Sequence, residues 1–148
     1  MTAYKRKSWK EKLEVDRKPE VEKTDKGFAG VKEGQLMLIP TPKLVDAYIR
    51  QIPNGSQADT HQIRKDLAAE YHAETTCPLT TGIFLRIVAE AAYEDYQNGR
   101  SLTEITPFWR AMDEYSPAAK KLTFGTALLK EQRRKEKLEP FRKLKTKA

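Results

Sequence analysis

The sequence predicts a mainly helical α+β domain that contains a helix-turn-helix and carries basic segments at both ends. Apolar residues recur at helical spacing in three successive stretches, within residues 44–52, 63–71 and 83–92. A Pro-Asn-Gly turn at residues 53–55 separates the first two stretches, and a short apolar run at residues 35–39 has the pattern of a strand. Two helices joined by a loop, with a third helix before them, is the plan of a helix-turn-helix domain.

The length and the charge distribution indicate one domain with flanking sequence. We divide the chain into a basic arm at residues 1–34, the helix-turn-helix domain at 35–129 and a basic tail at 130–148. The net charge is +7, of which residues 1–26 supply +3 and residues 130–148 supply +6, which leaves −2 between them. Basic charge favours acidic partners such as nucleic acid, and here it lies in the flanks.

The arm alternates charged residues with few apolar ones. Such a composition is typical of a disordered segment. The alternative is a short helix that docks on the domain through Trp9, Leu13 and Val15. The strand at residues 35–39 follows the arm and is stopped by the prolines after it.

The first two helices have recognisable ends. The first begins near Pro42, which suits a first helical turn, and ends at Asn54-Gly55, residues that accept the left-handed conformation. The second begins at Asp59, with Gln62 three positions later as in a capping box. Residues 72–76 are predicted to form a polar loop.

The third helix is predicted to be the most buried, because its apolar stripe is wide. It begins at Pro78, with Thr76 or Cys77 at the cap, and ends at Asn98-Gly99. The remaining segments are predicted as a loop with an extended piece (101–112), a last helix (118–132) and a charged helix or frayed tail (133–148).

Four short motifs occur in a fixed order within residues 44–112. They are Ile52-Pro53-Asn54-Gly55, Gln62-Ile63, Gly82 and Pro107-Phe108-Trp109-Arg110. This order resembles the DNA-binding domain of the alkylguanine-DNA alkyltransferases and of their non-catalytic relatives, the alkyltransferase-like proteins. The resemblance implies a winged-helix fold and the binding of double-stranded DNA, with alkylated guanine as the candidate target.

The last motif differs from the family at the reactive position. In the alkyltransferases a Cys nucleophile and an activating His stand where this sequence has Phe108 and Trp109. Neither ring can accept an alkyl group through a thiolate, so the resemblance implies that transfer is absent. The two rings, with Arg110 beside them, are predicted to line a base pocket by stacking on a flipped base; the alternative is that both rings are core.

The resemblance also places DNA contacts. Leu79 stands where the family has an Arg that replaces the flipped nucleotide, and an apolar wedge can also unstack bases. Thr60 stands at the place of a Tyr that helps to rotate the target phosphate. Thr80 and Thr81 either contact phosphate or cap the third helix, and Arg86 either contacts DNA or is a salt-bridged helix residue.

Two further features bear on DNA binding. The tail from Arg133 to Lys147 can bind phosphates non-specifically by counterion release, or it can serve only solubility. No glycine lies between Arg110 and Ala118, which predicts a short or missing wing.

The cysteine and histidine content limits other chemistry. A single cysteine, Cys77, excludes an internal disulfide and a multi-cysteine metal site. A helix N-terminus lowers the pKa of a thiol, but neither His61 nor His72 is fixed beside Cys77 by sequence, and a structural role is favoured. We expect no metal and no cofactor.

We therefore expect a cytoplasmic, non-catalytic DNA-binding protein without a small-molecule substrate. No apolar run approaches the ~20 residues needed to cross a bilayer, and the N-terminus has no apolar signal segment. The alternative is a winged-helix interaction or regulatory module that holds a protein partner, which the negative charge of residues 27–129 favours. An active alkyltransferase that uses Cys77 ranks third.

Overall fold

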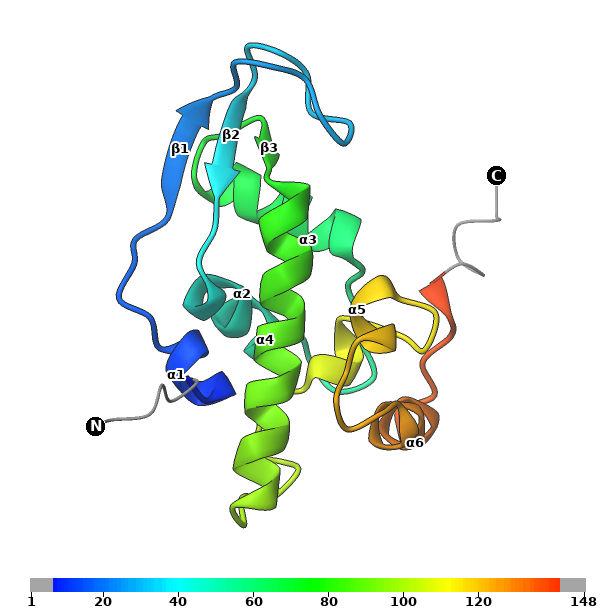
Figure 1. Ribbon diagram of the computed structural model, residues 1–148. Coiled ribbons are helices and arrows are strands. Elements are labelled where there is room, and N and C mark those ends of the chain that lie inside the picture. Colours follow the sequence, from blue (N-terminus) through cyan, green and yellow to red (C-terminus); the bar gives the residue numbers. More distant parts are fainter. Residues whose placement is uncertain (1–6, 142–148) are drawn as a thin grey trace, which may run out of the picture.

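The computed structural model describes residues 7–141 as an α+β fold built around one long helix. Figure 1 shows this helix, α4, running through the middle of the molecule, with a small sheet near its N-terminus and shorter helices along its sides. In chain order the elements are α1 (Trp9–Leu13), β1 (Glu20–Lys23), β2 (Leu36–Ile39), α2 (Pro42–Arg50), α3 (Thr60–Glu70), β3 (Thr75–Thr76), α4 (Pro78–Gln97), the 3-10 helix η1 (Phe108–Arg110), α5 (Pro117–Lys120) and α6 (Ala127–Lys135).

The three-stranded sheet is mixed and joins segments that are distant in sequence. β1 pairs antiparallel with β2, and β2 pairs parallel with β3. The strand expected at residues 35–39 is confirmed as β2. The polar loop expected at 72–76 is wrong in part, because Thr75 and Thr76 form β3 opposite Met37 and Leu38. A strand this short has no periodicity of its own, so only the partner strand defines it.

The N-terminal segment is more than an arm, because it supplies both α1 and β1. Ser8 and Glu11 close a capping box at the start of α1. Leu13 is buried, and Trp9 packs against the core. Glu94 of α4 accepts hydrogen bonds from the backbone N–H groups of Trp9 and Lys10, at 3.2 and 2.9 Å. The docked short helix is therefore confirmed for the described residues.

The beginnings predicted for α2, α3 and α4 are confirmed. Thr41 caps α2 ahead of Pro42 and accepts a hydrogen bond from the N–H of Leu44 at 3.1 Å. Asp59 caps α3 and accepts from the N–H of Gln62 at 2.9 Å. The reciprocal half of the capping box is not formed, because the Gln62 amide donates to Asp66 instead.

The predicted burial of the third helix is confirmed from Leu85 onward, whereas Ile83, at the start of the predicted stripe, is 57% exposed. α4 packs against α1, α2, α3, α5 and η1. Its fully buried apolar side chains, which form the centre of the core, are Leu85, Val88, Ala89, Ala91 and Ala92.

The C-terminal third differs from the prediction in two places. Residues 101–112 contain no extended piece, and Phe108–Arg110 form η1 instead. The single helix expected at 118–132 is two helices, α5 and α6, because Gly125 between them has a φ of +76°, which a helix cannot accommodate. Between residues 98 and 141 no strand is present, so no β-hairpin follows α4 in this part of the chain. Across residues 7–141 no helix combines the length and apolar character that crossing a membrane requires.

Candidate nucleic-acid interface

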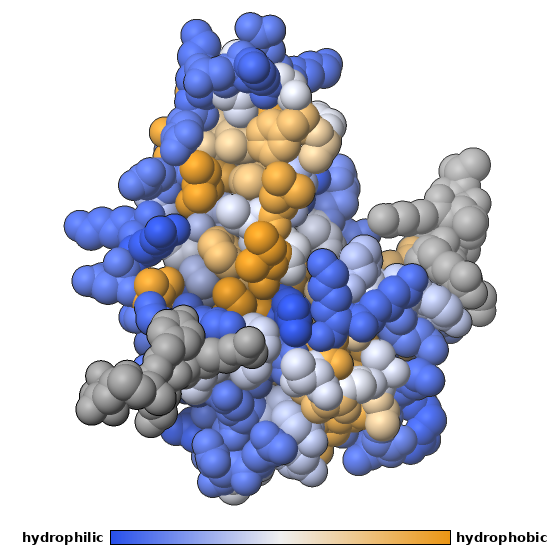
Figure 2. All heavy atoms as spheres, viewed as in Figure 1, coloured by the Kyte–Doolittle hydropathy of each residue, from blue (hydrophilic) through white to orange (hydrophobic). Residues whose placement is uncertain are grey.

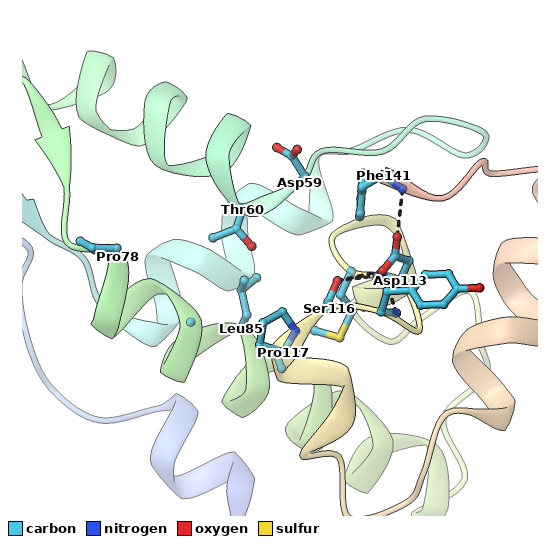
Figure 3. A pocket seen from close by; sticks show the side chains of 12 residues that line it. Asp59, Thr60, Pro78, Leu85, Asp113, Ser116, Pro117 and Phe141 are labelled. Carbon is cyan, nitrogen blue, oxygen red and sulfur yellow. Dashed lines mark hydrogen bonds between the residues drawn. The ribbon is translucent and has the colours of Figure 1, made fainter. Parts of the chain in front are cut away.

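The first turns of α3 and α4 open onto one cavity of about 460 Å³. Figure 3 shows its lining residues converging from α3, α4, the segment before α5 and the C-terminal segment. Thr60 lies on the α3 side and Pro78 and Gly82 on the α4 side, while Leu85 and Met112 give it an apolar interior. The cavity therefore lies between the two helices expected to form the helix-turn-helix.

Asp113 organises the wall of this cavity opposite α4. Its buried carboxylate accepts hydrogen bonds from the backbone N–H of Tyr115 at 2.9 Å, from the Ser116 hydroxyl at 3.2 Å and from the backbone N–H of Phe141 at 2.9 Å. Dashed lines in Figure 3 mark these interactions. Phe141, itself buried, is thereby fixed at the cavity, while the ring of Tyr115 stays 43% exposed. The polar groups of this wall are therefore joined by hydrogen bonds to one carboxylate, that of Asp113.

The N-terminus of α4, whose residue Pro78 lines the cavity, has no capping side chain. Cys77 occupies the cap position, but no side chain caps the helix by a hydrogen bond. The positive end of the helix dipole and the N–H groups of the first turn therefore remain suited to an anion. Leu79 projects from this first turn with 61% of its surface exposed, and Ile83 follows one turn later at 57%.

The structure places the remaining predicted DNA contacts unevenly. Thr60 is half-buried on the cavity wall. Thr81 is buried, and its hydroxyl donates to the Cys77 carbonyl oxygen at 2.7 Å, so the predicted phosphate contact from Thr81 is wrong. The Thr80 hydroxyl oxygen is enclosed and has no hydrogen-bond partner among the described residues. Arg86 lies 3.6 Å from the Glu90 carboxylate and over the Trp9 ring, which matches its salt-bridged alternative.

The aromatic pair does not form a base pocket. Phe108 is 0% exposed and Trp109 is 2% exposed. The Phe108 ring meets Trp109 and Phe124 edge to face, and the Trp109 indole N–H donates to Glu136 at 2.6 Å. This burial matches the alternative that both rings are core, because η1 turns both of them inward.

Arg110 also has a structural place and not a base-binding one. Its guanidinium donates to the Glu136 carboxylate at 2.9 Å and to the Ile52 carbonyl oxygen at 2.8 Å, while Glu136 accepts from the Gly55 N–H at 3.0 Å. Burial alone would raise the pKa of Glu136, but the hydrogen bonds from Arg110, Gly55 and Trp109 outweigh it and hold that pKa below its usual value. This group, which we call the Glu136 clamp, fixes the turn before α3.

The tail prediction needs a similar correction at Arg133. Its side chain is buried and donates to the carbonyl oxygens of Trp109, Met112 and Glu139. Arg133 is therefore unavailable to a phosphate. Residues 142–148, which hold the rest of the basic tail, lie outside the described residues.

Cys77 does not line the cavity. It is buried in a small second cluster with Val31 and Met37. Within residues 7–141 no group of His, Cys, Asp and Glu side chains could hold a metal ion.

Sequence reasoning missed the cavity wall formed by Asp113, Tyr115, Ser116 and Phe141. One usable signal was present, because Asp and Ser three positions apart ahead of a proline are typical of a tight turn at a helix start. Phe141, an aromatic residue inside a basic tail, was a second.

Comparisons of the chain with protein-family models, with curated proteins and with solved structures found no match. The structure alone describes the site: an α+β fold in which the N-termini of α3 and α4 share one cavity, with the exposed Leu79 in the first turn of α4.

Proposed function

We propose that this protein binds double-stranded DNA, without catalysing a reaction on it, through the face where α3 and α4 begin. One observation carries the proposal. The exposed Leu79 stands in the first turn of α4, a helix that no side chain caps, and Pro78 and Gly82 of the same helix line a cavity that opens between two helix N-termini. An apolar wedge beside a helix N-terminus combines two features by which proteins hold DNA, unstacking of a base step and contact with phosphate.

In this proposal α3 and α4 are the two helices of a helix-turn-helix, and α4 enters the groove. The connection, residues 71–77, is longer than the usual tight turn because it includes β3. The sheet that accompanies the helices comes mainly from before α2, in place of a wing after α4. The fold proposed is therefore a winged-helix relative with a displaced sheet.

The cavity supplies the receptor for an unstacked base. Its volume of about 460 Å³ lies within the range of ligand pockets, about 300–1,000 Å³. Leu85 and Met112 offer an apolar interior suited to an alkyl substituent, and the half-exposed ring of Tyr115 offers a stacking surface. Tyr115 thus takes the part that the sequence had suggested for Trp109.

The absence of transfer chemistry is part of the proposal. Phe108 stands at the position of the family nucleophile and is buried, and Cys77 is buried in a different cluster. Ser116, whose hydroxyl lines the cavity, donates to Asp113, and no histidine lines this cavity to activate it. We therefore expect the mass of the protein to stay unchanged after incubation with alkylguanine DNA.

The proposal is tested by titrating the full chain with plain and O6-methylguanine duplexes at two salt concentrations. Leu79→Ala should weaken binding to both duplexes, and Tyr115→Ala should reduce the preference for the alkylated one. Tyr96→Ala is the matched control, because it removes an exposed ring at the far end of α4. If the wild-type chain binds neither duplex at low salt, or if Leu79→Ala binds as well as wild type, the proposal fails.

A further inference from the structure

A second hollow, which we call the α4 groove, lies on the flank of α4 that faces α1 and α5. It encloses about 640 Å³ between Trp9 of α1, the first turns of α4 and Ala118 of α5. Leu79 and Ile83, one helical turn apart, border it and are the two most exposed large apolar side chains among the described residues. Figure 2 shows the resulting apolar strip over the N-terminal half of α4, with hydrophilic residues beside it.

The apolar strip has no partner within the described chain. A contiguous apolar surface rimmed by polar residues marks a binding site more often than a scattered exposed side chain does. Gly82 deepens the groove between Leu79 and Ile83, and a Cβ added there would meet nothing within 4 Å. Its backbone has no positive φ, so neither packing nor conformation inside the chain calls for glycine at this position. Close approach of another molecule would account for it.

The rim of the groove is cationic. Lys12, Arg86 and Lys121 line it and no carboxylate does, although Arg86 is paired with Glu90, which lies outside the groove lining. Lys12 and Arg86 both lie over the Trp9 ring, with the Lys12 Nζ 4.1 Å and the Arg86 guanidinium carbon 5.0 Å from its centroid. Lys121 is exposed and has no ion pair among the described residues. The groove therefore presents an apolar floor between positive charges.

We propose that the α4 groove binds an acidic amphipathic helix of a partner protein. Apolar side chains of such a helix, at i, i+3 or i+4, and i+7, would cover Leu79 and Ile83, and its flanking carboxylates would meet Lys12 and Lys121. This inference goes beyond DNA binding, although the groove and the DNA-binding face share Leu79. Ile83 belongs to the groove and does not line the cavity between α3 and α4.

Charge argues against the other occupants. Residues 1–6 and 142–148 carry basic residues and no acidic ones, so either end of the chain would bring positive charge to a positive rim. A second copy docked by a two-fold axis would bring together two surfaces whose charged rim residues without an ion pair in the described chain, Lys12 and Lys121, are both cationic. DNA has phosphates for the rim, but its bases present only separate methyl groups and edges in a groove, not a continuous apolar face to cover both Leu79 and Ile83.

The proposal is tested by selecting a phage-displayed library of random 16-residue peptides on the immobilised full chain. We expect the enriched peptides to be net negative with apolar residues three or four positions apart. A synthetic peptide of the best sequence, and the same peptide with Glu and Asp changed to Gln and Asn, are then titrated by fluorescence anisotropy. The neutral version should bind more weakly and with a smaller salt dependence.

Ile83→Gln separates the groove from other surfaces, because it removes the exposed apolar side chain from a helix without affecting the core. It should weaken peptide binding at least about tenfold, which is the loss expected for one well-covered aliphatic side chain. Tyr96→Gln, the control on the same helix, should bind the peptide as wild type does. Plain duplex DNA should bind Ile83→Gln as it binds the wild-type chain.

Four results on peptide binding and assembly would each overturn the inference. They are the enrichment of no peptide, selected peptides without net negative charge, equal peptide binding by Ile83→Gln, and a wild-type dimer in sedimentation that Ile83→Gln dissociates. Loss of DNA binding in Ile83→Gln would also overturn it, since the groove would then belong to the DNA-binding face. A chain that binds the peptide but no DNA would defeat the proposed function and leave this inference standing.

Discussion

Gly82→Ala is expected to stabilise the fold and to weaken binding. Gly82 lies inside α4 with an ordinary helical backbone, and a Cβ there would meet nothing within 4 Å. Glycine in a helix interior is less favourable than alanine by about 0.5–1 kcal/mol, chiefly through the freedom of the unfolded chain. For a chain of this length the gain corresponds to a rise in melting temperature of roughly 1–4 °C.

Gly125→Ala is the matched control for this change. A Cβ at Gly125 also meets nothing within 4 Å, but the φ of +76° there places alanine in the left-handed region, which costs roughly 1–2 kcal/mol. Circular dichroism melts of both variants should therefore move in opposite directions. Binding should fall only in Gly82→Ala, because Gly82 lines both the cavity and the α4 groove.

Two results would refute this reasoning. A lower melting temperature for Gly82→Ala would mean that the space around its Cα is not open. A higher melting temperature with unchanged affinity for DNA and peptide would mean that nothing approaches α4 at this glycine.

Three other changes follow from the described contacts. Trp109→Ala should cost roughly 3–5 kcal/mol of unfolding free energy in a urea titration, as for a buried aromatic side chain. A cost near zero would mean that Trp109 is exposed and not part of the core. Glu136→Gln should cost about 1–3 kcal/mol at pH 7. The folded-state pKa of Glu136 lies below its unfolded value of about 4.3, so its charge stabilises the fold at pH values above about 4.3. The difference in unfolding free energy between Glu136→Gln and wild type should therefore shrink as the pH falls through the folded-state pKa. A pH-independent difference would contradict the role of the Glu136 clamp. Deleting residues 142–148 should weaken DNA binding and flatten its salt dependence by up to about 0.9 in slope for each phosphate that this segment neutralises, without lowering the melting temperature. If the salt dependence of DNA affinity is unchanged by the deletion, residues 142–148 do not contribute to DNA binding.

The helix starts could be predicted from the sequence because their signals are local. A cap residue such as Asp59 acts on the N–H groups of the next turn, and Pro42 and Pro78 suit a first turn whatever surrounds them. The apolar stripe of α4 is likewise contained in one segment. These features do not depend on which other parts of the chain lie nearby.

The cavity and the inward turn of η1 depend on contacts between distant residues. Whether Phe108 and Trp109 face a base or the core is decided by Phe124 and Glu136, which only the tertiary fold brings next to them. β3 exists because Leu38 and Met37 lie beside it. The break between α5 and α6 is a different case, since Gly125 is a local signal that by itself indicates the end of a helix.

The Glu136 clamp has a consequence for chains that are incomplete. It joins Gly55 and Ile52, in the turn before α3, to a residue near the C-terminus, and Phe141 completes the cavity wall from still further along the chain. During synthesis the helices α2, α3 and α4 emerge well before either contact is possible. A truncated product that ends before residue 136 would contain α2, α3 and α4 and still lack the contacts that fix the turn before α3 and complete the cavity wall. Such fragments would lack the assembled face that we propose for DNA binding.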